Sequence, residues 1–282
     1  MTAELTRFLA AYDAMTGRWP GPVDRLDLRS GYGTTRVIAC GPADGKPLVL
    51  LHGGGTTAAV WFANAADLSR ARRLYAVDRI GEPGRSLPGG RPIRTPDDLL
   101  SWLDGVLGGL GLDRADLCGH SYGGWLALSY TRHAPDRVRK LVLLDPTQCF
   151  AGYRAGYLLR AMPVLLRPTA GRARAFLAWE TRGAPVDPGW RTLYGLAAEF
   201  PHARVVTGKR PRPEQLREVT TPTLVLLAGD SRAHRVQRVA AAAQRDLPHV
   251  ETAVLPGVSH HGMPFVQAAA LDGMILGFLD KP

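Results

Sequence analysis

"ADLCGHSYGGWLALSYTRH", residues 115–133, places a strand pattern, a glycine-flanked serine and a helix pattern in direct succession. The apolar run that ends at His120 is typical of a buried strand, and the segment after Ser121 has the length of a helix. Gly119 and Gly123 permit a tight strand-to-helix turn, which would raise the Ser121 side chain above the end of the sheet. The start of a helix also favours negative charge. We therefore predict that Ser121 is a nucleophile. The alternative is a glycine-rich connection with an idle serine.

Short apolar runs alternate with longer amphipathic segments along the rest of the chain. The runs that resemble strands are residues 34–40, 46–52, 73–78, 115–120, 139–145, 222–229 and 251–256. Several are continuously apolar, which fits strands buried on both faces of a mostly parallel sheet. Helix patterns follow Thr95-Pro96 and cover 122–133, 234–246 and 264–280. This alternation predicts an α/β fold.

One long segment, residues 150–217, contains no convincing strand. It holds three helix-like pieces separated by proline and glycine. A connection of this length is unusual in a compact domain unless it is functional. We predict a helical lid (cap) over 150–217 on an α/β core formed by 1–149 and 218–282. Additional packing helices are the alternative.

The composition argues against several classes of protein. The 282 residues carry a formal net charge of +10, but the 31 arginines and four lysines are scattered, so we expect no nucleic-acid partner. Three widely spaced cysteines do not suggest a disulfide framework or a zinc site. We find neither a signal-peptide pattern nor an apolar run of about 18 residues, so we expect a cytoplasmic protein with no membrane partner. The sequence does not indicate the oligomeric state.

The glycine run His52-Gly53-Gly54-Gly55 follows an earlier strand pattern. Glycines let backbone amides approach a ligand closely. The amide of Gly54 or Gly55, paired with that of Tyr122, would bind an oxyanion. A phosphate-binding loop is the rival interpretation, but the lysine and hydroxyl residue of that motif are missing.

Two histidines follow the last strand pattern in "PGVSHHG", residues 256–262. A histidine in this position can reach a nucleophile raised above the sheet. We expect His260 to be the general base, with His261 as the competitor. His202, His234 and His249 are expected to be surface or loop residues.

These motifs, in this order, resemble the esterase branch of the α/β-hydrolase superfamily. The resemblance rests on "LVLLHGGG", "YAVDRIGEPGRS", "GHSYGGWLAL", "HAPDRVRKLVLLDP", "TPTLVLLAGD" and "LPGVSHH". It implies an eight-stranded sheet, a helical lid after the sixth strand and the chain order nucleophile, acid, histidine. It also implies Ser121 as nucleophile, His260 as base, and Gly54 and Tyr122 as oxyanion donors.

Of the three catalytic residues, the acid is the one that the sequence identifies least clearly. In the family it most often follows the seventh strand, a few residues past a glycine, and in "LAGDSRAHR" (227–235) that position holds Arg232. Asp230 lies only one residue past Gly229. The other placement known in the family, the end of the sixth strand, holds Asp145. We expect Asp145 to be the acid, with Asp230 as the alternative and an incomplete triad as the third interpretation.

We therefore expect a serine hydrolase that cleaves a carboxylic ester, lactone or thioester of a small molecule through an acyl-enzyme intermediate. No cofactor or metal is required. The alternatives are a biosynthetic enzyme using the same triad for acyl transfer, cyclisation or C–C hydrolysis, and a non-catalytic ligand-binding protein. Candidate pocket residues, about half of which we expect to be ordinary core, are Trp61, Trp125, Phe150, Trp179 and Tyr194.

Overall fold

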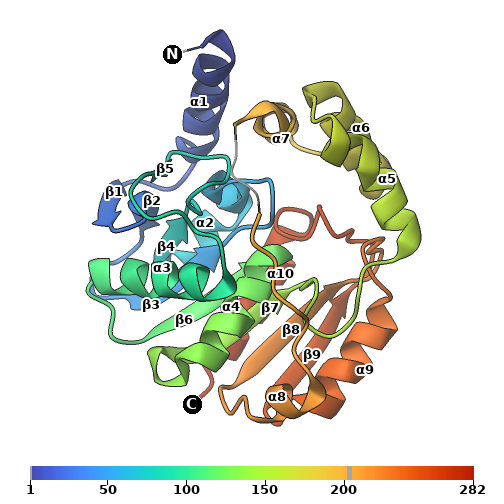
Figure 1. The fold of residues 1–282 in the computed structure, drawn as a ribbon. Helices are drawn as coiled ribbons and strands as arrows, with labels where there is room; N and C mark the ends of the chain where they lie inside the picture. The colour runs from blue at the N-terminus through green and yellow to red at the C-terminus, as the bar shows by residue number, and fades with distance from the viewer. Residues whose placement is uncertain (1, 202–204) are drawn as a thin grey trace.

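A computed structural model describes residues 2–201 and 205–282 as a twisted sheet with helices on both faces (Figure 1). Its strands are β1 (Val23–Ser30), β2 (Gly33–Cys40), β3 (Lys46–Leu51), β4 (Arg72–Val77), β5 (Leu87–Pro88), β6 (Ala115–His120), β7 (Val138–Leu144), β8 (Thr223–Ala228) and β9 (Val250–Leu255). The order across the sheet is β1-β2-β4-β3-β6-β7-β8-β9, and the two-residue β5 pairs with β2. Without β5 the sheet has the expected eight strands, and the helical insert follows the sixth, β7.

Strand direction divides the sheet into two parts. β1 pairs with β2 and β2 with β4 in antiparallel fashion, whereas all pairs from β4 to β9 are parallel. In the parallel part, the carboxyl ends of the strands meet at one edge, where sites in α/β folds form. The predicted α/β-hydrolase fold is confirmed.

The sequence analysis predicted seven of these strands and missed β1 and the two-residue β5. β1 alternates charged and apolar residues and lies at the edge of the sheet, with most of its side chains at least partly exposed. An edge strand of this kind has no continuous apolar run to identify it.

Helices cover both faces of the sheet. They are α1 (Ala3–Thr16), α2 (Ala65–Leu68), α3 (Pro96–Gly109), α4 (Tyr122–His133), α5 (Ala155–Leu166), α6 (Ala170–Glu180), α7 (Pro188–Glu199), α8 (Pro213–Arg217), α9 (Val236–Asp246) and α10 (Ala268–Leu279), with 3₁₀ turns η1 (Ala58–Ala63) and η2 (Pro135–Arg137). The predicted helix over 264–280 begins only at Ala268, because Gln267 has a left-handed backbone with φ of 56°.

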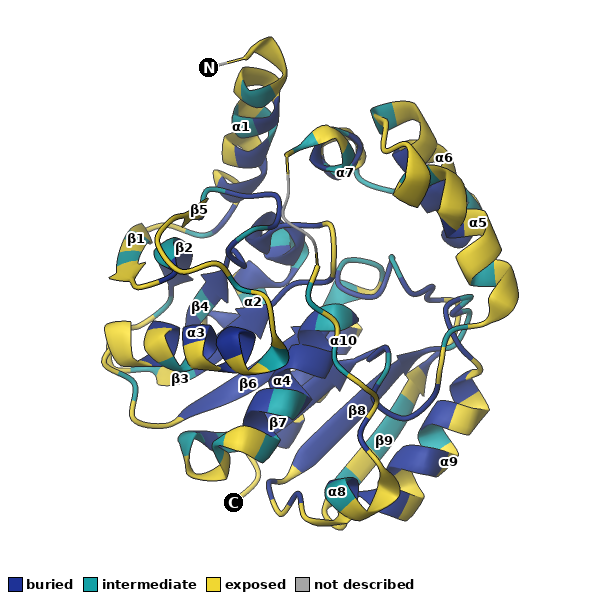
Figure 2. Cartoon of the chain, viewed as in Figure 1, coloured by how far each residue is buried: buried dark blue, intermediate teal, exposed yellow. Residues whose placement is uncertain are grey.

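Alternate residues of the parallel strands enter two hydrophobic cores. In β3, Val49 and Leu51 pack with α3, α4 and α9, whereas Leu48 and Leu50 pack with α1, α2 and α10. Burial on both faces explains why these strands read as continuous apolar runs. Figure 2 shows the resulting buried centre of the sheet.

The insert between β7 and β8 forms an arch of helices beyond the carboxyl edge of the sheet (Figure 1). Its helix α7 packs against α1, and the Phe8 and Phe200 ring centroids lie 4.7 Å apart. Its last helix, α8, places Leu216 in the core with α9. The predicted lid range also contains residues 202–204, which lie outside the described residues. No helix in the described ranges is long and apolar enough to cross a membrane.

One buried carboxyl group makes the stability of the fold depend on pH. Asp272 of α10 is 1% exposed; its Oδ1 accepts a hydrogen bond of 2.8 Å from Asn64 Nδ2, and its Oδ2 has no partner among the described residues. Burial raises the pKa of Asp272 to about 7.

Because this folded-state pKa is higher than that of the unfolded chain, the folded state binds the extra proton. The contribution of Asp272 to the free energy of unfolding is complete below about pH 4. This contribution, up to about 4 kcal/mol, is lost as the pH rises through about 7. Asp272→Asn should therefore reduce the loss of unfolding free energy between pH 5 and pH 8, measured by urea denaturation. The exposed Asp44→Asn is the control. An unchanged pH dependence in Asp272→Asn would contradict the prediction.

Candidate active site

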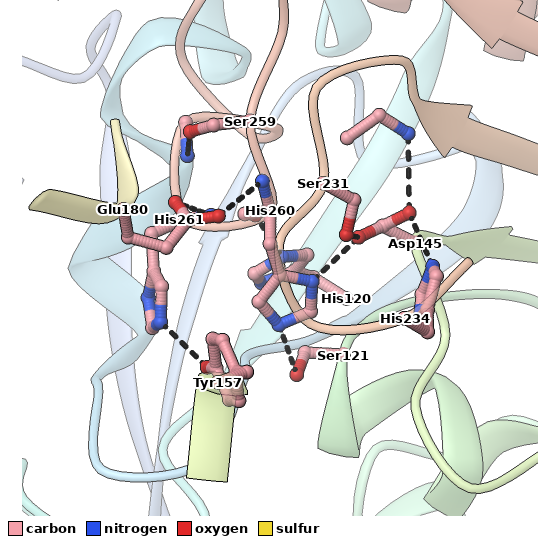
Figure 3. Close-up of polar contacts among 12 residues, drawn as sticks. His120, Ser121, Asp145, Tyr157, Glu180, Ser231, His234, Ser259, His260 and His261 are labelled. Carbon is pink, nitrogen blue, oxygen red and sulfur yellow. Dashed lines mark hydrogen bonds and ion pairs between the residues drawn. The ribbon is translucent and has the colours of Figure 1, made fainter. Parts of the chain in front are cut away.

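Three polar side chains meet at the carboxyl edge of the sheet (Figure 3). Ser121 follows β6, Asp145 follows β7, and His260 lies in the loop after β9. Ser121 Oγ lies 2.9 Å from His260 Nε2, and His260 Nδ1 lies 2.6 Å from Asp145 Oδ2. All three residues are buried, with exposed fractions of 8%, 1% and 0% for Ser121, His260 and Asp145. The structure thus brings together the serine, the histidine and the acid that the sequence analysis named.

The turn at Ser121 has the sharp backbone geometry that the flanking glycines predicted. Ser121 has φ of 54° and ψ of −115°, a conformation that non-glycine residues rarely adopt. A Cβ atom at Gly123 would lie 2.2 Å from the Leu51 carbonyl oxygen, so only glycine fits there. Strain of this kind is typical of functional sites. Asp145 is also in a positive-φ conformation, with φ of 42°.

The Asp145 carboxylate accepts four hydrogen bonds. Its Oδ1 accepts from the Ala228 amide at 3.1 Å and from His234 Nε2 at 2.9 Å, and its Oδ2 accepts from Ser231 Oγ at 2.8 Å and from His260 Nδ1. Burial alone would raise the pKa of Asp145, but the charge and hydrogen bond of His234, followed by those of His260, outweigh burial and hold it well below its usual range. Asp145 is therefore a fixed anion beside His260.

The alternative acid occupies a different position. Asp230 is partly exposed, and its amide donates to the Val258 carbonyl, but its carboxylate has no hydrogen bond to His260. The loop after β8 instead supplies donors to Asp145. His234 lies in a loop, one of the two expected positions, but it is not a surface residue, because it is buried and bonded to Asp145. Arg232 lies over the Trp179 ring, 4.5 Å from its centroid.

The histidines around the site have different proton affinities. Burial lowers the pKa of His260, but the hydrogen bond and charge of Asp145 outweigh burial and raise it above its ordinary value. Burial lowers the pKa of His261 to about 4, and its Nε2 lies 3.0 Å from Tyr157 Oη. Burial also lowers the pKa of His120, whose Nε2 donates to the His260 carbonyl. Only His260, therefore, combines a raised pKa with contact to the serine.

The glycine loop after β3 is held in place by buried polar contacts. The Gly55 amide donates to Glu82 Oε2 at 2.7 Å, and Glu82 pairs with Arg79. By contrast, neither the Gly54 nor the Tyr122 amide has a protein acceptor among the described residues. Of the two candidate amides in the loop, Gly54 is thus the one whose donor is free.

Helices of the insert contact the histidine loop directly. Glu180, at the end of α6, is fully buried, and its carboxylate accepts hydrogen bonds from the amides of His260 at 3.0 Å and His261 at 2.9 Å (Figure 3). The Tyr157 ring of α5 meets His260 edge-on, with centroids 6.1 Å apart. The sequence analysis missed both residues, since nothing in the sequence indicates which helical faces of the insert point toward the sheet.

The five aromatic residues expected in a pocket occupy different environments. Trp61, Trp125 and Phe150 lie in the two hydrophobic cores. Trp125 packs against the Tyr122 ring at 5.2 Å between centroids. Trp179 lies 5.7 Å from Phe176, and Tyr194 meets His261 edge-on at 5.7 Å.

Removing the hydrogen bond between His234 and Asp145 should lower the activity of the enzyme. A hydrogen bond to a charged group contributes about 1.5–3 kcal/mol, so His234→Phe is expected to lower kcat/KM for a p-nitrophenyl ester by about 10- to 100-fold. Steady-state kinetics across pH measures the effect. The exposed His249→Phe provides a matched control. Equal rates for His234→Phe and the unmodified chain would contradict a role through Asp145.

Comparisons with known proteins agree with this geometry. A model of the alpha/beta hydrolase family matches residues 48–272. Carboxylesterase YbfK of Bacillus subtilis is 27% identical over 289 residues, which cover 97% of this chain and 93% of that protein. The crystal structure of carboxylesterase CesB (YbfK) has a TM-score of 0.92 at 25% identity, and that of naproxen esterase, also from Bacillus subtilis, has a TM-score of 0.91 at 25% identity. Both alignments cover 99% of each chain, insert included.

Proposed function

This chain belongs to the alpha/beta hydrolase family, and from that premise we propose that it hydrolyses carboxylic esters, lactones or thioesters through Ser121, His260 and Asp145. It is a carboxylic ester hydrolase, as its similarity to carboxylesterases over nearly its whole length supports. The observation that carries the assignment of residues is the continuous series of hydrogen bonds from Ser121 Oγ through the His260 ring to Asp145.

Each member of the series has a defined task in the proposed reaction. His260 Nε2 takes the proton of Ser121 as Oγ attacks the carbonyl carbon of the substrate. Asp145 orients the His260 ring and stabilises the imidazolium, in agreement with the raised pKa of His260. His260 then donates its proton to the leaving group. In the second half, His260 activates a water molecule, which releases the acyl group from Ser121.

The free amides of Gly54 and Tyr122 are the proposed oxyanion donors. Donors of this kind each contribute about 3–4 kcal/mol when they are aimed at the developing negative charge. The Tyr122 amide lies at the N-terminus of α4, and no acceptor of the described chain competes for it. The Glu82 contact of the neighbouring Gly55 amide fixes the loop, so that Gly54 is positioned before substrate binds.

We propose residues 150–217 as the lid over a core of 1–149 and 218–282. The contacts of Tyr157 and Glu180 with the histidine loop support this division. Trp179 and Tyr194 are the proposed substrate-pocket aromatics, and the core residues Trp61, Trp125 and Phe150 are left out. The three cysteines are free and buried, in keeping with a cytoplasmic location.

A fluorophosphonate probe tests the proposal without knowledge of the natural substrate. The folded chain should be labelled once, and peptide mass spectrometry should find the label on Ser121. The intact mass after rapid quenching of a p-nitrophenyl ester reaction should show an acyl-enzyme. A folded chain that takes up neither label nor acyl group would instead be a ligand-binding protein on a hydrolase scaffold.

A further inference from the structure

The outer face of α5 exposes an unusual concentration of large apolar side chains. Five of the nine exposed large hydrophobic residues in the described chain lie on this helix, with exposed fractions from 41% to 75%. They are Leu158, Leu159, Met162, Leu165 and Leu166. The spacing i, i+1, i+4, i+7, i+8 puts them on one side of the helix. Figure 2 shows α5 at the outside of the arch, with most of its surface exposed.

The opposite side of α5 covers the candidate active site. Ala161 is buried, and Tyr157 contacts His261 through its hydroxyl group and His260 through its ring. The inward side of the helix therefore has its packing partners within the chain. No residue of the described chain covers the outward apolar side.

The chain segment that contains α5 carries charge of one sign. Between Asp145 and Glu180 the sequence contains no acidic residue and five arginines: Arg154, Arg160, Arg167, Arg172 and Arg174. All five are exposed, and none forms an ion pair within the residues that the structure describes. An exposed apolar face with nearby unpaired cations is typical of helices that lie in the interface of an anionic membrane.

We propose that α5 docks on the surface of an anionic phospholipid bilayer, with its leucines inserted at the level of the headgroups and its neighbouring arginines bound to lipid phosphates. A second copy of this chain is the competing occupant. In a two-fold contact between α5 faces, the arginines of the two copies would come close together. Neither segment would supply an acidic side chain to pair with them. The charge pattern thus favours lipid.

This proposal revises the expectation of no membrane partner. That expectation rested on the absence of a spanning apolar run, and a helix that lies in the interface needs no such run. The proposal does not depend on the catalytic assignments, since binding of the chain to lipid can be measured without turnover. In this arrangement α5 contacts His260 on its inward side and lipid on its outward side.

Vesicle co-sedimentation of the whole chain tests the proposal. We expect binding to vesicles of phosphatidylcholine and phosphatidylglycerol, and binding about tenfold or more weaker to phosphatidylcholine alone. The double variant Leu159→Ser/Leu166→Ser should lose about tenfold or more in affinity for the anionic vesicles. Arg160→Gln/Arg167→Gln should weaken binding and reduce its dependence on salt.

The control is Leu87→Ser/Met274→Ser, which removes two other exposed apolar side chains, with exposed fractions of 66% and 41%, elsewhere on the surface. It should bind as the unmodified chain does. Circular dichroism of every variant verifies that each is folded. Absence of binding to anionic vesicles, or full binding by Leu159→Ser/Leu166→Ser, would overturn the proposal. So would light scattering that finds a dimer which this double variant converts to a monomer.

Discussion

Ser121→Ala is expected to lower kcat for a p-nitrophenyl ester by about 10⁶-fold, the loss found when the nucleophile of a serine hydrolase is removed. The serine hydroxyl lies in contact with His260, and alanine leaves no atom there that can attack a carbonyl. The residual rate would come from the oxyanion donors and from binding alone. Steady-state kinetics with active-site titration of the unmodified chain measures the ratio.

The control for this substitution is Ser101→Ala, on the exposed side of α3. It should keep full activity and full fluorophosphonate labelling. The Ser121→Ala chain should unfold at a similar temperature to the unmodified chain, because alanine keeps the Cβ atom and the same backbone conformation. A folded Ser121→Ala chain with more than a small fraction of normal kcat would show that another residue attacks the substrate.

Asp145→Asn is expected to lower kcat by about 10⁴-fold. The carboxylate accepts from His260 Nδ1 and from three other donors, and an amide side chain cannot accept on both sides. If the amide nitrogen faces His260, it stabilises the wrong tautomer, and the ring cannot take the proton of Ser121. The pKa of His260 should also fall, because its increase depends on Asp145. The acid limb of kcat/KM against pH should therefore move to lower pH.

Asp230→Asn is the matched control for this prediction. Its carboxylate does not contact His260, so we expect nearly normal kcat and an unshifted pH profile. Circular dichroism and fluorophosphonate labelling distinguish a slow enzyme from an unfolded one, which matters because Asp145 is fully buried. If Asp230→Asn abolished turnover and Asp145→Asn spared it, the acid would be Asp230.

The sequence predicted the parts of the fold whose patterns are local. Seven strands, the turn at Ser121 and the helical nature of the insert follow from apolar runs and glycine spacing. β1 and α1 were not predicted, because β1 is a charged edge strand and α1 gains its partners, η1 and α7, only in the folded chain.

The sequence predicted the main residues of the candidate site but not the residues that hydrogen-bond to Asp145. Asp145 and His260 could be named from their positions after strands with the help of a family resemblance. The link between Asp145 and His234 joins residues 89 apart in the sequence, and it exists because β7 and β8 are neighbours in the sheet. The unusual stretch "LAGDSRAHR" thus provides hydrogen-bond donors to an acid located on the adjacent strand.

The Glu180 contact has a consequence for how this protein responds to heat. A single carboxylate at the end of α6 holds the backbone of His260 and His261. The insert has an exposed outer surface, whereas the central strands β6, β7 and β8 are buried, so α6 belongs to the part of the molecule expected to open locally at lower free energy. Release of α6 would free the histidine loop while the sheet stays intact. We therefore expect activity to be lost on heating through release of this helix end, below the temperature at which the α/β core melts.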